Sequence, residues 1–172
     1  MKLWLEKFAS PIGMLRIVSD GEVLRALDFE EYDERLRRLL GRHYGEVELS
    51  EGQAPRAVRE ALAAYFAGDI RAVDRLPTAT GGSDFQREVW AALRRIPAGR
   101  TTSYGALAAK IGKPKAMRAV GLANGANPIC IVVPCHRVIG ADGSLTGYGG
   151  GLPRKRWLLA HEGIEMPARA AA

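Results

Sequence analysis

Residues 103–125 read SYGALAAKIGKPKAMRAVGLANG, two short helical segments separated by little more than GKP. Ser103 is a suitable N-cap for the first segment, whose apolar residues recur at helical spacing. Pro114 suits the first turn of the second segment, which we expect to run from 114 to 125. Two short helices this close together predict a helix-turn-helix unit with 114–125 as its recognition helix, although neighbouring helices of an ordinary bundle give the same pattern.

The sequence on either side of this unit extends the same domain. Ser83 and Gln86 form a capping-box pattern that begins a helix with apolar residues at helical spacing. After the unit, IGADGSLTGYGGG has the composition of a hairpin or wing, and LPRKRWLLAHEG predicts a last helix. We therefore expect a winged-helix domain over residues 83–163.

The first half of the chain has a different pattern. Three runs alternate like strands, and two later segments have helical periodicity: KLWLEKF, MLRIVS and EVLRALDF, then YDERLRRLLGRHY and APRAVREALAAYFAG. This order predicts a small α/β domain over residues 1–78. The polar, glycine-rich segment PTATGGSD, residues 77–84, is the best candidate for a linker. Residues 164–172 read as a loose tail.

Length and composition fit a globular protein. The chain has 172 residues, of which 47% are apolar and 26% charged. It contains no apolar run long enough to cross a bilayer, and MKLWLEKFAS does not resemble a signal peptide. Two cysteines, Cys130 and Cys135, are too few for a disulfide framework, so we expect a reduced, cytoplasmic setting and no membrane partner.

The charge is unevenly distributed. Residues 1–82 carry 12 Lys or Arg against 14 Asp or Glu, whereas residues 83–163 carry 12 against only 4. A basic half suggests a polyanion partner, with DNA or RNA as the default, although a solvated cationic surface is the simpler alternative.

The segment PICIVVPCHRV, residues 128–138, contains the side chains that could carry out a reaction. Pro134 ends a buried-looking run and predicts a turn at 134–136 that presents Cys135. Beside His136 and Arg137 this thiol could be partly ionised and nucleophilic, but a buried structural thiol is the commoner case. Glu162 could hold His136 in one tautomer, or it could be surface charge. Cys130, among isoleucines and valines, reads as a core residue, and no zinc spacing is present.

At this point the residues resemble a known family. PCHRV, preceded by RAVGLANGANP and followed by GYGGG and RKRWLLAHEG, is similar to the O6-alkylguanine-DNA alkyltransferases, also called methylated-DNA–protein-cysteine methyltransferases. The resemblance is strong over residues 83–163 and looser before them, where SPIG and AYFAGD also match. It implies an α+β fold class: a ribonuclease-H-like N-terminal domain followed by a winged-helix C-terminal domain.

The resemblance also implies a function. Members of this family repair DNA: they enter the minor groove, flip the damaged guanine out and move the alkyl group from O6 to a cysteine. An alkyl thioether gives water no carbonyl to attack, so we expect each molecule to react once. The implied enzyme needs no cofactor and no metal.

The family motifs place catalytic roles on five residues. Cys135 matches the nucleophile, His136 the base that takes its proton through a water, and Glu162 the residue that orients His136. Tyr104 looks like the tyrosine that donates to the departing base, and Asn127 like the asparagine that braces the active-site turn. Tyr104 could also be a core residue, and Asn127 an ordinary turn residue before proline.

Six more positions match contacts to the substrate or to DNA. Arg118 resembles the arginine that fills the gap left by the flipped base, but it could also be one more surface cation. The resemblance further implies a base contact from the Val133 carbonyl, a pocket loop containing Tyr148 and Gly149, and DNA contacts at Ser103 and Ala119.

The expected partner is double-stranded DNA containing O6-alkylguanine. Activity on O4-alkylthymine, the range of alkyl groups and cooperative binding to DNA are left open, and we expect a monomer. Two other readings compete: a winged-helix transcription factor without chemistry, and a cysteine hydrolase or acyltransferase that turns over without DNA.

Overall fold

The computed structural model describes residues 1–166, which form two compact units. Unit 1 consists of residues 1–82 together with 128–132, and unit 2 consists, among the described residues, of 83–127 and 133–166. Of the expected tail, residues 167–172 lie outside the described part of the chain. The α+β fold class expected from the sequence is confirmed.

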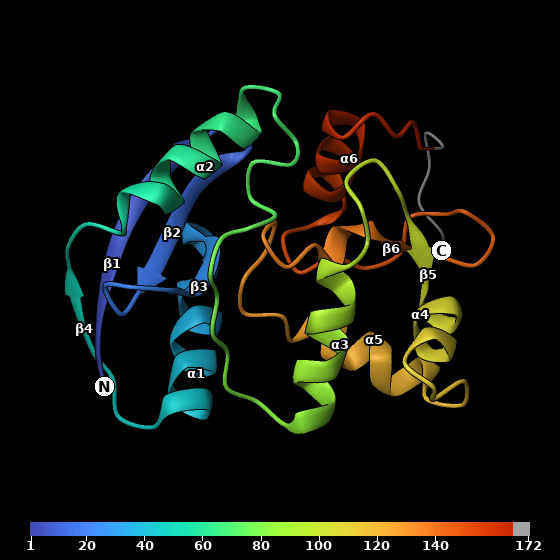
Figure 1. The fold of residues 1–172 in the computed structure, drawn as a ribbon, viewed down its shortest axis with the longest axis horizontal. Helices are drawn as coiled ribbons and strands as arrows, with labels where there is room; N and C mark the ends of the chain where they lie inside the picture. Colours follow the sequence, from blue (N-terminus) through green and yellow to red (C-terminus); the bar gives the residue numbers. More distant parts are fainter. Residues whose placement is uncertain (167–172) are drawn as a thin grey trace. The chain divides into compact units, whose positions relative to one another are not determined.

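Unit 1 is built on a four-stranded sheet (Figure 1). The three strands expected from the alternating pattern are present, and a short fourth one joins them: β1 (Lys2–Ser10), β2 (Gly13–Ser19), β3 (Leu24–Phe29) and β4 (Glu48–Glu51). Their order is β3-β2-β1-β4. β1 and β3 are antiparallel to β2, whereas β4 is parallel to β1. The sequence did not predict β4, because ELSE has no apolar alternation.

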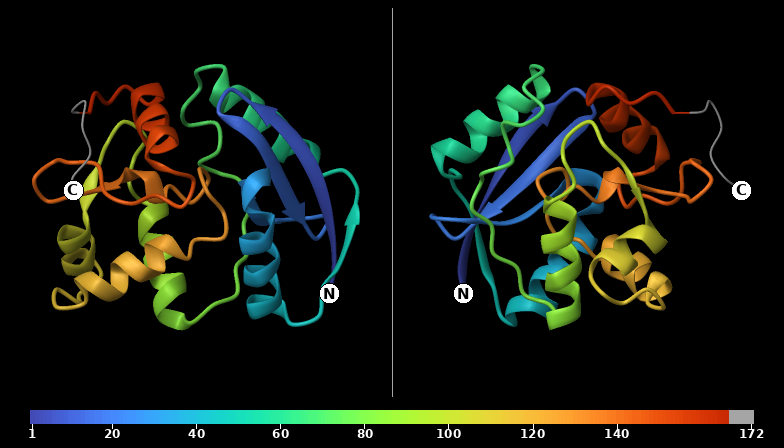
Figure 2. Two further views of the ribbon diagram at one scale, coloured as in Figure 1. Left: turned by 180° about the vertical axis from the view of Figure 1, so that it is seen from behind. Right: turned by 45° about the vertical axis from the view of Figure 1, so that its right-hand side comes forward.

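One helix covers each face of this sheet (Figure 1, Figure 2). The short 3-10 turn η1 (Glu30–Tyr32) leads into α1 (Asp33–Tyr44), and α2 (Arg56–Phe66) follows β4. Leu36 and Leu40 of α1 pack in one cluster with buried residues of the sheet, Leu3, Leu5, Val18 and Ala26. Phe66 of α2 stacks on Phe8, with ring centroids 6.3 Å apart. Because side chains alternate along β1, Leu5 and Phe8 face opposite sides, so the two helices are separated by the sheet.

The outer edge of β3 is paired with two segments from elsewhere in the chain. The Leu24 N–H donates to the Pro77 carbonyl, at 3.1 Å, so the expected linker begins as a paired segment. The Leu27 N–H donates to the Pro128 carbonyl, at 2.9 Å, and the Leu27 carbonyl accepts from Cys130, at 3.0 Å. This pairing explains why residues 128–132 belong to unit 1 although both flanking segments belong to unit 2.

Ile131 ends the paired segment in a strained conformation. Its φ is +69°, and the Val132 N–H donates to the Cys130 carbonyl, at 2.7 Å. This is a γ-turn with positive φ, which is rare for any residue and most unfavourable for a β-branched one. The Ile131 side chain is fully buried, so packing holds the turn that leads toward Cys135.

Unit 2 is mostly helical. Its helices are α3 (Asp84–Arg94), α4 (Tyr104–Lys110), α5 (Met117–Gly125) and α6 (Leu152–His161), with a 3-10 turn η2 (Cys135–Arg137). Two very short strands pair in parallel, β5 (Thr102–Ser103) and β6 (Val138–Ile139). The capping box expected at Ser83 and Gln86 is confirmed, and Ser103 accepts from the Ala106 N–H at the start of α4, at 3.1 Å.

The helix expected over 114–125 is shorter than predicted. Residues 114–116 form a turn closed by a 2.9 Å hydrogen bond from the Ala116 N–H to the Lys113 carbonyl, and α5 begins at Met117. α5 packs beside α3 and α4 (Figure 2). The Trp90 indole of α3 donates to the Ala123 carbonyl, at 2.8 Å. The segment after β6 turns around Asp142 and Gly143 and forms no strand ladder, so the wing is a loop.

Close packing of Gly81 against α1 gives a test of unit 1. A Cβ added at Gly81 would lie 2.6 Å from the Cβ of His43 and 3.0 Å from its backbone, and backbone cannot move aside easily. We expect Gly81→Ala to lower the free energy of unfolding by about 1–3 kcal/mol, measured by urea denaturation.

The matched control is Gly41→Ala in α1, where a Cβ meets nothing within 4 Å. Alanine favours helix over glycine, so this variant should gain about 0.5–1 kcal/mol. Equal effects of the two substitutions would contradict the packing of Gly81.

Candidate active site

Cys135 opens a short turn, as the sequence predicted. Pro134 has φ −83° and ψ 66°, and the Cys135 N–H donates to the Val133 carbonyl, at 2.8 Å, which is the geometry of an inverse γ-turn. η2 follows directly, with the Arg137 N–H bonded to the Pro134 carbonyl, at 3.0 Å. Cys135 is 7% exposed, and neither cysteine of the chain forms a disulfide.

A cavity of about 360 Å³ lies beside Cys135 in unit 2. Its volume falls in the range of small-molecule sites, roughly 300–1,000 Å³. Eight residues line it, and four of them are glycines, which leave the space open: Tyr104, Gly121, Asn124, Gly125, Cys135, Gly147, Tyr148 and Gly149. The structure thus brings four expected site residues to one cavity, namely Cys135, Tyr104, Tyr148 and Gly149.

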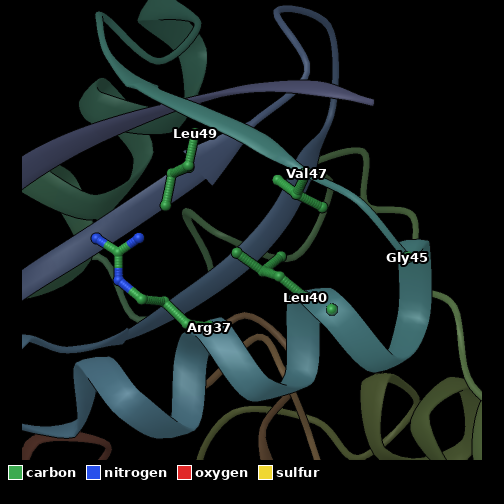
Figure 3. A pocket seen from close by; sticks show the side chains of 6 residues that line it. Arg37, Leu40, Gly45, Val47 and Leu49 are labelled. Carbon is green, nitrogen blue, oxygen red and sulfur yellow. The ribbon is translucent and has the colours of Figure 1, made fainter.

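A second cavity, of about 190 Å³, lies in unit 1 between the end of α1 and β4 (Figure 3). Arg37 and Leu40 line it from α1, and Val47 and Leu49 line it from the strand side. No cysteine, histidine or carboxylate lines this cavity, so it carries none of the chemistry expected for group transfer.

His136, Arg137 and Glu162 form a buried charged cluster. The His136 Nε2 lies 2.8 Å from Glu162 Oε2, and Arg137 Nε donates to Glu162 Oε1, also at 2.8 Å. Arg137 also donates to the Ile96 carbonyl, at 2.7 Å. All three side chains are almost fully buried. A buried carboxylate needs such compensation, because an unpaired charge is very costly away from water.

This cluster fixes the protonation of His136. Burial alone would raise the pKa of Glu162, but its hydrogen bonds and ion pairs with His136 and Arg137 lower that pKa to about 2. Burial lowers the pKa of His136, against the opposing effect of Glu162. Since the carboxylate only accepts, Nε2 carries the proton and Nδ1 is left as an acceptor. Nδ1 is buried and has no hydrogen-bond partner among residues 1–166, so it can serve as a base.

Asn127 and Val133 support the turn before Cys135. The Asn127 side-chain amide donates to the Val133 carbonyl, at 2.7 Å, and this oxygen also accepts from the Cys135 N–H. Both lone pairs of the Val133 carbonyl are therefore used, and Val133 does not line the cavity. Val133 thus supports the turn, and the base contact expected from its carbonyl stays a prediction.

Lys155 anchors the loop that forms one side of the cavity. Its side chain is fully buried, and its Nζ donates to the carbonyls of Val138, Thr146 and Gly147, at 2.6, 3.1 and 3.4 Å. Burial lowers the pKa of Lys155 to about 8, whereas the nearby Cys135 acts to raise it. On the other side of the cavity, the Tyr104 hydroxyl lies 3.0 Å from Thr146 Oγ1, which ties α4 to the same loop.

The remaining expected residues lie outside the cavity. Arg118 and Ala119 are exposed on α5, next to exposed apolar side chains of the same helix, Met117 at 56% and Leu122 at 72%. Ser103 uses its hydroxyl to cap α4. All three positions belong to unit 2, and the DNA contacts expected of them stay predictions.

Sequence reasoning missed three residues of the site: Arg137, Lys155 and Asn124. The sequence placed Arg137 beside Cys135 only as a cation that could favour the thiolate, and it counted Lys155 among the basic residues of 83–163, because charged residues are usually exposed. A signal was present for Lys155, because Lys155, Leu158, Leu159 and Glu162 have the i, i+3, i+4, i+7 spacing of one helix face. Nothing in the sequence distinguished Asn124 from its small neighbours.

Residues 1–166 contain no group of three or more His, Cys, Asp or Glu side chains that could hold a metal ion. In the same part of the chain, no helix combines the length and apolar character needed to cross a membrane.

Comparison with known proteins covers nearly the whole chain. Residues 4–80 match the family model described as 6-O-methylguanine DNA methyltransferase, ribonuclease-like domain, and residues 84–164 match its DNA binding domain. A methylated-DNA–protein-cysteine methyltransferase of Salmonella typhimurium is 54% identical over 95% of this chain and 97% of its own length. One from Mycolicibacterium paratuberculosis is 50% identical over 92% of each chain.

Solved structures give the same result. The crystal structure of Mycobacterium tuberculosis OGT in complex with DNA is 43% identical, with a TM-score of 0.78 over 98% of this chain and 96% of that one. An O6-methylguanine-DNA methyltransferase from the archaeon Pyrococcus kodakaraensis is 28% identical, with a TM-score of 0.70 over 94% of this chain and 99% of that one.

The buried cluster predicts a loss of stability in acid. A carboxyl whose pKa is lowered by folding stabilises the protein above its unfolded value, and this contribution disappears as the pH falls toward the folded value. For Glu162 the loss should run from about pH 4.5 to about pH 2 and total on the order of 3 kcal/mol. His136 adds a loss in the same direction, which begins below pH 6.5.

Urea denaturation at a series of pH values checks this prediction. Glu162→Gln should remove the loss between pH 4.5 and 2, and at pH 7 it should destabilise the protein by about 3–5 kcal/mol because Arg137 is left unpaired. Glu165→Gln, at an exposed position, is the control. If Glu162→Gln lost stability in acid as the unmodified protein does, the buried pair of Glu162 and Arg137 would not be the cause of that loss.

Proposed function

Because this chain belongs to the O6-alkylguanine-DNA alkyltransferase family, the methylated-DNA–protein-cysteine methyltransferases, we propose that Cys135 is the residue that receives the alkyl group. The protein is a DNA-repair enzyme, and its partner is DNA. The single observation that carries the assignment of the nucleophile is the cavity of about 360 Å³ beside the Cys135 thiol.

The proposed reaction is a displacement at carbon. The Cys135 thiolate attacks the alkyl carbon attached to O6 of guanine, a sulfur–carbon bond forms, and the carbon–oxygen bond breaks. The electron pair of that bond goes to the guanine, and the thiol proton goes to His136 Nδ1. The support for His136 as the base is its Nδ1 acceptor, set by the bond from Nε2 to Glu162.

The departing guanine needs a proton or a hydrogen-bond donor. We assign this role to the Tyr104 hydroxyl, which lies at the cavity and is within 3.0 Å of Thr146 Oγ1. Tyr148 and Gly149 also line the cavity, where a backbone N–H can meet O6. Donors placed where negative charge develops lower the barrier because they need no reorganisation during the reaction.

Access to the base requires that it leave the duplex. We assign Arg118, on the exposed face of α5, to the gap left by the flipped guanine, and Ala119 and Ser103 to the DNA surface beside it. Flipping costs a few kcal/mol, and an inserted arginine replaces part of the lost stacking. Of the 12 basic residues in 83–163, Arg137 and Lys155 are buried, so the remaining ones supply attraction to the phosphates.

The same chemistry makes the protein a reagent that is used once. An alkyl thioether has no carbonyl for water to attack, so the methylated Cys135 is a stable end product. We further propose duplex DNA with O6-alkylguanine as the substrate, a monomer as the active form and the cytoplasm as the compartment. The support for the compartment is chemical: a nucleophilic thiol remains reduced there.

Intact-mass measurement tests the nucleophile and the stoichiometry together. After incubation with an excess of duplex DNA containing O6-methylguanine, the protein should gain one methyl group, located on Cys135 by peptide mapping. Cys135→Ser should gain none, whereas Cys130→Ser should react like the unmodified protein. More than one guanine restored per protein molecule would refute the single-use mechanism.

The role of Arg118 predicts a difference between two substrates. Arg118→Ala should slow methyl transfer from duplex DNA by about 10- to 100-fold, because part of the cost of flipping is no longer offset. The rate with free O6-methylguanine base should not change, since this substrate needs no flipping. An equal loss on both substrates would place Arg118 in the chemistry or in folding.

A further inference from the structure

Two side-chain amides hold the turn at Cys135, one from the last turn of α5 and one from just beyond that helix. The Asn127 amide donates to the Val133 carbonyl, at 2.7 Å, and the Asn124 amide donates to the Cys135 carbonyl, at 3.4 Å. These two carbonyls lie on either side of Pro134 in the chain. The resemblance to known relatives accounts for Asn127 but gives Asn124 no role.

Two backbone hydrogen bonds lie within the turn. The Cys135 N–H donates to the Val133 carbonyl, and the Arg137 N–H donates to the Pro134 carbonyl. The direction of the Cys135 side chain follows from the orientation of the peptide groups on either side of its Cα. The peptide group before the Cys135 Cα is held through its N–H, which donates to the Val133 carbonyl that Asn127 also binds. The peptide group after it is held by the Asn124 amide, which donates to the Cys135 carbonyl.

Asn124 is buried and lines the cavity. It is 6% exposed, and its side chain is the one amide among the eight lining residues. Its Oδ1 is buried without a hydrogen-bond partner among residues 1–166. An amide with an unpaired oxygen is a costly way to fill space that a leucine of similar volume would fill, so its value at this position lies in the donor.

Asn124 also connects the nucleophile to the helix that carries Arg118. Both residues belong to α5, whose exposed face bears Arg118 while Asn124 faces the interior. A shift of α5 would therefore reach Cys135 directly through the amide. This connection rests on the proposed function, in which α5 contacts DNA and Cys135 is the nucleophile.

We propose that Asn124 is a positioning residue: with Asn127 it forms a two-amide clamp that ties the Cys135 turn to α5 and aims the thiol into the cavity. Asn124 acts through the Cys135 peptide group and takes no part in bond formation. Its amide is neutral, so it holds the turn without adding charge beside the sulfur.

Two substitutions of Asn124 separate its hydrogen-bond donor from its lack of charge. Asn124→Leu keeps the volume and removes the donor, and Asn124→Asp keeps the shape but places a carboxylate against the Cys135 carbonyl. Ala109→Asp, on the exposed side of α4, adds the same charge at a surface of unit 2 and serves as the control. The groups already around Cys135 that titrate or carry charge are His136, Arg137, Tyr104, Tyr148, Lys155 and Glu162.

The first measurement is the rate of Cys135 alkylation by iodoacetamide from pH 5 to pH 9, followed by peptide mass. We expect Asn124→Asp to move the midpoint to higher pH, because a negative charge near the sulfur disfavours the thiolate. Asn124→Leu and Ala109→Asp should keep the midpoint of the unmodified protein. A midpoint that does not move in Asn124→Asp would overturn the proposal.

The second measurement is methyl transfer from free O6-methylguanine base. Asn124→Leu should lower this rate by about three- to tenfold, as expected for the loss of one neutral hydrogen bond. An unchanged rate would mean that the amide only fills space. The iodoacetamide reaction does not require DNA repair, so failure of this proposal is distinguishable from failure of Cys135 to accept a methyl group from DNA.

Discussion

The ion pair between Glu162 and Arg137 is the interaction on which the active site depends. The carboxylate lies at the end of α6 and the guanidinium in the turn that begins with Cys135, and neither is in contact with bulk water. Away from water each charge is tolerated only because the other is present. Arg137 also reaches the Ile96 carbonyl beyond α3, so one pair joins three segments that are distant in the sequence. His136 then has a single arrangement, with one nitrogen bound to Glu162 and the other available as a base.

Lys155 plays a similar part near Cys135, the proposed nucleophile. A buried ammonium group needs acceptors, and the chain supplies three backbone carbonyls, at Val138, Thr146 and Gly147. Two of these belong to the glycine-rich loop that lines the cavity. Glycines leave room for a base but give the loop little packing of its own, so the lysine provides the hydrogen bonds that fix its course. The cavity therefore combines an open wall with a backbone held by a buried cation.

In the proposed function, helix α5 joins DNA recognition to the chemistry of Cys135 within unit 2. Its exposed face carries Arg118 and two large apolar side chains, Met117 and Leu122. Asn124 in its last turn and Asn127 just beyond it supply amides to the turn of Cys135. The strained γ-turn at Ile131 and the inverse γ-turn at Pro134 bring the chain to this point without a regular element. A sharp turn of this kind gives the thiol a direction that neither a strand nor a helix would give it.

By itself the sequence determined the elements whose signals are local. The alternation of β1 to β3, the periodicity of α1 and α2, the capping box at Ser83 and the turn at Pro134 all depend on neighbouring residues, and the PCHRV motif identified the family.

Other features depend on residues far apart in the chain. The four residues of β4, three of them polar, form a strand only because β1 offers an edge. Residues 128–132 pair with β3 across about a hundred residues of sequence. Likewise, Arg137, Lys155 and Asn124 look like surface or filler residues until folding removes water from around them. Only the tertiary structure could decide their roles, because the energy of a charge or an amide is set by the partners that burial leaves within its reach.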